Sequence, residues 1–157
     1  MNHRRTNDDI RERGQSLVET ALGMMVVLAV LAGMVDFGLA FGHRIALTNA
    51  SRSGARFASR YPKLETNINM TIIEALRGTF VLPEDYDHFA DANEDLRIEV
   101  VCVNGIGPVG CEYATRGDQV QVTVSYDYRP IFGGILGVQE LLVGSSTIMN
   151  VLGPDEL

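Results

Sequence analysis

The sequence contains no tryptophan, only two cysteines and only three histidines among its 157 residues. Two cysteines exclude a dense disulfide framework, and by themselves they cannot supply the four ligands of a structural zinc site. Basic residues are fewer than acidic ones, 13 against 20, and the net charge of −7 argues against a nucleic-acid partner. The chain is 46% apolar, which excludes collagen-like, low-complexity and wholly disordered proteins.

Sequence signatures of catalysis are also missing. Neither G-x-S-x-G nor H-E-x-x-H occurs. Gly105–Gly110 has the form G-x-G-x-x-G, but Pro108 interrupts it and no helical pattern follows, so we expect no dinucleotide site. We therefore expect a protein that is not an enzyme and that binds no cofactor.

Charge and apolarity divide the chain into four segments. The first has a slight basic excess, the second is apolar with two acidic residues, and the third carries four arginines and no acid. The last carries five basic and fifteen acidic residues. We expect a leader at 1–14, a transmembrane helix at 15–42, a basic helical stalk at 43–60 and an acidic head at 61–157.

The second segment predicts a membrane span. Ala21–Val35 is uncharged, and the run from Thr20 to Gly42 is roughly 35 Å long as a helix, enough for a core of ~30 Å if Asp36 is tolerated. A cleaved signal peptide is the alternative, but the long basic front and the lack of a small-x-small cleavage site favour an uncleaved anchor. The arginines of residues 1–14 predict a cytoplasmic amino terminus and a head outside.

Three motifs follow one another through the first 58 residues. Gly14–Glu19 reads GQSLVE after a basic front, Asp36–Gly38 reads DFG, and Ser53–Ala58 reads SGARFA. Together they resemble the TadE-like family of the tight-adherence (Flp, type IVc) pilus. The resemblance is strongest over Arg11–Ala58 and weaker over the carboxy-terminal strands.

The resemblance implies a function and a set of partners. Relatives are minor pilins or pseudopilins, which a prepilin peptidase cuts after the glycine that corresponds to Gly14. The implied partners are other pilin or pseudopilin subunits, the prepilin peptidase, the membrane and the pilus assembly platform. The implied location is the cytoplasmic membrane of a bacterium or archaeon, or the pilus itself.

The proposed cleavage has a physical rationale. Gly14 has no Cβ, so a protease gains close access to the backbone, and cutting there frees an amine on Gln15. Glu19 lies one helical turn away, and its carboxylate could pair with the amine of a neighbouring subunit. Such a partner offsets the ~2.5–3.5 kcal/mol that a charge costs near the centre of a span. Alternatively, Glu19 lies at the lipid headgroups and costs little.

Asp36 is the second carboxylate of the apolar run. It lies about seven residues beyond the middle of the span, roughly 10 Å along a helix. Its carboxylate either reaches toward the outer interface or makes an intersubunit contact within a helical bundle.

One helix without a proline is predicted from Gln15 to Tyr61, and Pro62 ends it. Two stripes with a spacing of four residues run along it, one of small residues and one of arginines: Ala50, Gly54 and Ala58, and Arg52, Arg56 and Arg60. Residues four apart share a helix face, so the helix has a close-packing side and a cationic side. The arginines are solvated, bind phospholipid headgroups, or face the acidic head of the same chain or of a neighbour.

The remainder of the chain predicts a small α+β head. Helical spacing marks 65–77, and strand patterns mark 97–103, 119–128 and, less clearly, 145–151. The glycine-rich stretch 130–143 is expected to be a loop or an extra turn. The clearest strand alternates strictly and places one set of residues on a single face: Val120, Val122, Val124, Tyr126 and Tyr128. An antiparallel sheet packed on the helix fits this order.

Cys102 and Cys111 flank a short loop at the end of the first predicted strand. Outside the cytoplasm this pair is expected to form a disulfide that staples the strand connection; two free thiols are the alternative.

A different function class also fits: a permanently membrane-anchored module whose acidic head binds a ligand or a metal. Its candidate calcium ligands are Glu84, Asp85, Asp87, Asp91 and Asp95. A standard EF-hand is excluded, because Leu96 and Cys102 occupy the positions of its glycine and its last glutamate. A solvated acidic loop without metal is the expected state.

Overall fold

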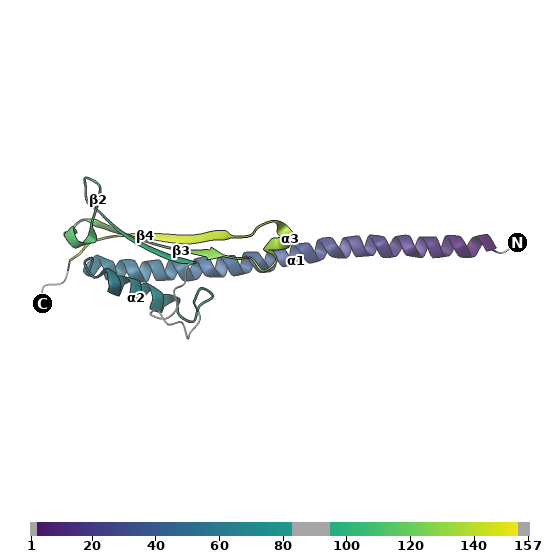
Figure 1. Ribbon diagram of the computed structural model, residues 1–157, viewed down its shortest axis with the longest axis horizontal. Coiled ribbons are helices and arrows are strands. Elements are labelled where there is room, and N and C mark those ends of the chain that lie inside the picture. The colour runs from purple at the N-terminus through teal and green to yellow at the C-terminus, as the bar shows by residue number, and fades with distance from the viewer. Residues whose placement is uncertain (1–2, 83–94, 154–157) are drawn as a thin grey trace. The chain divides into compact units, whose positions relative to one another are not determined.

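The structure is a computed structural model that describes residues 3–82 and 95–153 (Figure 1). It divides into two compact units, Met1–Phe37 and Gly38–Leu157. The longest element, α1 (His3–Arg60), contributes residues to both. The sequence predicted this helix only from Gln15, yet it begins a dozen residues earlier. Arginine and glutamate in the leader favour helix, and one glycine costs only about 1 kcal/mol.

In the first unit, α1 exposes its apolar side chains. Every residue from Gly14 to Leu31 is exposed, and large side chains such as Leu17 and Met25 are 71% and 67% exposed. Within the described residues, one helix, Gly14–Arg60, is long and apolar enough to cross a membrane. An apolar surface of this extent is unfavourable in water and requires lipid or other apolar helices around it.

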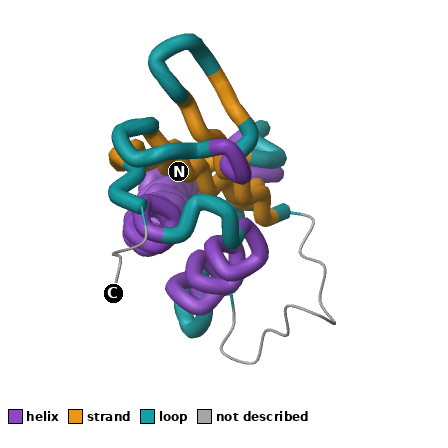
Figure 2. The backbone as a smooth tube through the Cα atoms, turned by 90° about the vertical axis from the view of Figure 1, so that its left-hand side faces the viewer, coloured by secondary structure: helices purple, strands orange, loops and turns teal. Residues whose placement is uncertain are grey.

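The second unit contains a four-stranded antiparallel sheet (Figure 2). Its strands are β1 (Leu96–Val103), β2 (Pro108–Val109), β3 (Gln119–Tyr128) and β4 (Leu141–Asn150), in the order β2-β1-β3-β4. Together with the second helix, α2 (Glu65–Leu76), this sheet confirms the predicted α+β class.

The alternation in β3 sets the register of the sheet. Val120, Val122 and Val124 are fully buried, and Tyr128 is nearly so. Val122 lies opposite Val100 of β1 and Thr147 of β4. Because side chains alternate between the two faces of a strand, a slip of one residue would expose this valine set. The predicted boundaries of β3 and the predicted sharing of one face by its alternate residues are both confirmed, and that face is the one directed to the core.

The last strand differs from its prediction. β4 begins at Leu141, inside the stretch 130–143 that was expected to be a loop, and it ends at Asn150 rather than at residue 151. Leu141 pairs with Tyr128, so the extra residues complete the pairing with β3 along its whole length. The glycines that suggested a loop occupy the preceding turn, including the short helix α3 (Gly133–Leu136). Only Gly144 lies in the strand.

The core of the second unit forms where α1 contacts both α2 and the sheet. The small-residue stripe is buried, as predicted: Ala50 and Ala58 are fully buried, and Gly54 lies against both neighbours. A Cβ at Gly54 would be 2.5 Å from Ile72 Cγ1 of α2 and 3.4 Å from Val122 Cγ1 of β3. Such distances leave room for a hydrogen only, so glycine sets how closely α2 approaches α1.

Candidate assembly surfaces and a basic cavity

The predicted processing and pairing residues share the exposed start of the apolar helix. Gly14, Gln15 and Glu19 are all exposed and helical, and Glu19 lies about one turn after Gln15. In the same turn the Thr20 hydroxyl donates to the Ser16 carbonyl at 2.8 Å, which satisfies the hydroxyl within the helix. The Glu19 side chain is thus presented on an uncovered helix surface.

Asp36 is in a different environment from Glu19. Its side chain is buried, with 6% of its surface exposed, although it belongs to the apolar helix. A buried carboxylate requires hydrogen-bonding or charged surroundings. The two carboxylates that the sequence assigned to the same role therefore differ in accessibility.

The arginine stripe lies on the outer side of α1. Arg52, Arg56 and Arg60 are all exposed, in contrast to the buried small-residue stripe of the same helix. In the part of the chain that the structure describes, no salt bridge connects these arginines to a carboxylate. The stripe is therefore a cationic surface open to a partner.

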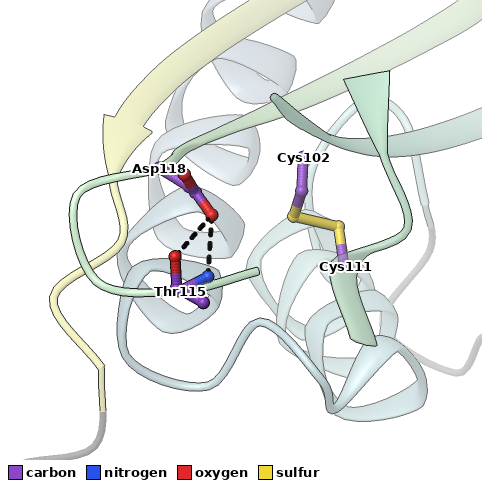
Figure 3. Close-up of a disulfide and its surroundings, with 4 residues drawn as sticks. All are labelled: Cys102, Cys111, Thr115 and Asp118. Carbon is purple, nitrogen blue, oxygen red and sulfur yellow. Dashed lines mark hydrogen bonds between the residues drawn. A yellow bond between two sulfur atoms is a disulfide. The ribbon is translucent and has the colours of Figure 1, made fainter. Parts of the chain in front are cut away.

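A disulfide connects the end of β1 to the segment after β2. Cys102 and Cys111 are bonded, with their Cα atoms 5.1 Å apart, which confirms the predicted staple. Cys111 begins a short 3₁₀ helix, η1 (Cys111–Tyr113). Figure 3 shows the turn that follows, in which the Asp118 carboxylate accepts hydrogen bonds from the Thr115 backbone N–H and hydroxyl at 2.8 and 3.0 Å. The disulfide and this turn together fix the position of the connection into β3.

A cavity of about 890 Å³ lies beside this turn, at the C-terminal end of α1. Among the described residues, its lining includes three exposed basic residues, Arg60, Lys63 and Arg116, and no acidic one. The rest of the lining is mainly apolar or uncharged: Tyr61, Pro62, Leu64, Ala114, Thr115, Val151, Leu152 and Gly153. The arginine spacing along α1 marked Arg60 but not Lys63, which follows the end of the helix, nor Arg116, which comes from a distant part of the chain.

A buried histidine lies at the other end of β3. His43 Nδ1 donates to the Leu39 carbonyl at 2.7 Å, and its ring stacks on Tyr126 with centroids 5.4 Å apart. Burial and the nearby Asp95 carboxylate raise the pKa of Tyr126 above its ordinary value, and Arg129 lowers it by a smaller amount. This cluster joins α1 to the sheet, and its histidine is enclosed rather than available for catalysis.

The acidic loop proposed as a calcium site falls mostly outside the described residues. Of its candidate ligands only Asp95 is described, and its carboxylate pairs with Arg129 Nη2 at 3.2 Å. Among the described residues, no group of three His, Cys, Asp or Glu side chains could hold a metal ion.

These observations define a class: an α+β protein with an amino-terminal apolar helix long enough to cross a membrane. Within that class, residues 14–56 match the family model described as TadE-like protein, so the chain contains a TadE-like domain at its amino-terminal end. This domain suggests a component of tight-adherence pilus assembly, in a family that is generally non-enzymatic. No curated protein and no solved structure matches the chain.

Proposed function

We propose that the chain is a minor pilin or pseudopilin that takes part in assembly of a tight-adherence pilus. It is anchored in the cytoplasmic membrane by α1, with residues 1–14 in the cytoplasm and the acidic head outside. The observation that carries the proposal is the TadE-like match, which begins at Gly14 on a helix whose apolar side chains are uncovered.

In this proposal a prepilin peptidase cuts between Gly14 and Gln15. Cleavage removes the charged leader and leaves an amine at the start of the apolar helix. Exposure of Glu19 one turn further on supports its pairing with the corresponding amine of a neighbouring subunit. In lipid, where a lone carboxylate is costly, such a pair would favour assembly over the free subunit.

The other two candidate contacts have unequal support. Arg52, Arg56 and Arg60 are exposed, and we propose that they face the acidic heads of neighbouring subunits. Each exposed ion pair contributes about 1 kcal/mol or less, so the stripe would orient subunits more than hold them. Asp36 is buried in the isolated chain, and an intersubunit role would require it to change its surroundings on assembly.

The mass of the intact protein extracted from native membranes tests the proposal. Processing predicts a chain that lacks residues 1–14 and begins at Gln15, with or without amino-terminal methylation. A matched strain without the prepilin peptidase should yield the uncut chain. Uncut protein in peptidase-containing cells would contradict the proposal and would favour a permanently anchored module that binds a ligand.

A further inference from the structure

The basic cavity is built by three separate parts of the second unit. The Leu152 backbone N–H donates to the Ser59 carbonyl at the end of α1, at 2.8 Å. The Val151 N–H donates to the Asp118 carbonyl at 2.7 Å, and the Gly117 N–H donates to the Val151 carbonyl at 2.9 Å. These bonds fix the segment after β4 between the end of α1 and the Thr115–Asp118 turn, and the cavity lies where the three meet.

The charges around this cavity are unbalanced. Arg60, Lys63 and Arg116 are exposed, and none of them forms a salt bridge with a carboxylate among residues 3–82 and 95–153. Like charges that share one cavity repel each other, and an anion between them removes that repulsion. Apolar lining residues such as Leu64 and Leu152 favour an anion that is carried on a peptide over a small hydrated ion.

The sequence that follows the cavity lining is acidic. Gly153 lines the cavity and has a left-handed φ of +77°, and the residues that follow are Pro154, Asp155, Glu156 and Leu157. An extended chain advances at most ~3.6 Å per residue, so chain length alone limits the distance from Gly153 to the backbone of residue 155 to about 7 Å. Both acidic side chains are therefore within reach of the three cations.

We propose that the basic cavity is a carboxylate-binding site and that its occupant in the isolated subunit is the acidic tail of the same chain, Asp155 and Glu156. This inference is independent of the pilus assignment, since it uses only contacts within the second unit. It also gives the tail a role in binding: an acidic segment of another protein can enter the site only by displacing Asp155 and Glu156.

The mobility of the tail tests this proposal directly. Leu157→Cys supplies the sole free thiol, because Cys102 and Cys111, the two native cysteines, are bonded to each other. A small uncharged nitroxide on this thiol, in the full chain in detergent, should give an immobilised spectrum. Neutralising the tail with Asp155→Asn and Glu156→Gln should make the spectrum mobile without altering any of the described residues that line the cavity. The same spectrum in both proteins would overturn the proposal.

Variants of the cavity provide the complementary test. Lys63→Gln with Arg116→Gln should also release the tail, whereas Arg52→Gln with Arg56→Gln, which removes two exposed arginines outside the cavity, should not. An octapeptide of alternating Asp and Glu serves as the external probe. It should bind the neutral-tail protein about five- to tenfold more tightly than the unmodified protein, since loss of one to two weak ion pairs to the tail corresponds to roughly that factor. Equal binding to both proteins, or binding to neither, would show the proposal to be wrong.

Discussion

Gly54 illustrates how much a single position can determine in this protein. On the sequence it belongs to a stripe of small residues, which indicates close packing but not the partner. In the structure its missing Cβ admits Ile72 of α2, while Val122 of β3 approaches from the sheet. At this one glycine α1 therefore lies against two other elements, α2 and β3.

Gly54→Ala should therefore destabilise the second unit. The added methyl would lie 2.5 Å from Ile72 Cγ1 and 2.7 Å from Ile72 Cδ1, so either the Ile72 side chain must shift or the helices must separate, at a cost of about 1–3 kcal/mol. Gly38→Ala is the matched control, because a methyl group added there would have no atom within 4 Å, and it should be neutral or stabilising by up to about 1 kcal/mol. Denaturant unfolding in detergent measures both, and equal effects would contradict the packing argument.

Tyr126 predicts a dependence of stability on alkaline pH. Its pKa in the folded protein is raised above 10.0 by burial and by Asp95, whereas the unfolded chain has the ordinary value. The folded state therefore holds the phenol proton more tightly, and this contribution is complete below about pH 10 and is lost as pH rises through the folded pKa.

Tyr126→Phe should make the decline of unfolding free energy above about pH 10 shallower, because phenylalanine has no proton to lose. Denaturant midpoints measured from pH 8 to 11 test this, with Tyr113→Phe, at an exposed tyrosine, as the control. If the decline of unfolding free energy with pH were unchanged by Tyr126→Phe but reduced by Tyr113→Phe, its attribution to Tyr126 would be wrong.

Among the elements, those governed by local pattern were predicted well and those governed by distant contacts were not. The strict alternation of β3 and the helical spacing of α2 gave their boundaries to within a residue or so. The start of β4 was missed, because its pairing with Tyr128 overrides the glycine-rich context. β2, two residues long, has no periodicity to detect and exists through its pairing with β1.

The basic cavity was beyond sequence reasoning for the same physical cause. Arg60 and Lys63 are close in sequence, but Arg116 reaches them only because backbone hydrogen bonds join the end of α1, the segment after β4 and the turn before β3. The spacing of residues along the sequence does not predict hydrogen bonds between such distant segments. The disulfide was predictable because its two cysteines flank one short loop.

Removing that disulfide should weaken the connection between β1 and β3. The bond closes a loop between residues nine apart in sequence, so Cys102→Ser with Cys111→Ser should lower the unfolding free energy by roughly 2–4 kcal/mol. Denaturant unfolding of oxidised wild type and of the double variant gives this difference. Ser125→Ala, a half-buried site in the same sheet, is a control expected to change stability little. A double variant as stable as wild type would mean that strand pairing alone fixes the connection.

At the scale of the whole chain, the two units differ in whether their apolar side chains are buried. The hydrophobic core of the described residues runs from Ala46 to Val151 and lies wholly in the second unit. The large apolar residues of the first unit from Leu17 to Phe37 are exposed and need lipid or other apolar helices around them. This difference fits the proposed function, in which the head of the subunit folds outside the membrane and its helix lies in lipid or in a bundle of helices.

Glu19→Ala distinguishes membrane insertion of the apolar helix from its assembly with neighbouring subunits. It removes a charge from the apolar helix, so membrane insertion should be kept or improved, while loss of the proposed pair with a neighbouring amine should reduce co-assembly. Pilus yield and co-purification of other pilin subunits measure assembly, and membrane fractionation measures insertion. Glu74→Ala, at an exposed acid of α2, is the control. Normal piliation with Glu19→Ala would argue that this carboxylate has no role in docking.

The contact between Gly54 and Ile72 also constrains how this protein can diverge. The hydrogen at one position and the branched side chain at the other fill a single space, so neither can be enlarged alone. Homologous chains that carry alanine or serine at position 54 should carry a smaller residue such as alanine at position 72, and the two positions should covary. In the laboratory, Ile72→Ala removes both Cγ1 and Cδ1, so Gly54→Ala combined with Ile72→Ala should lose less stability than the sum of the two single changes.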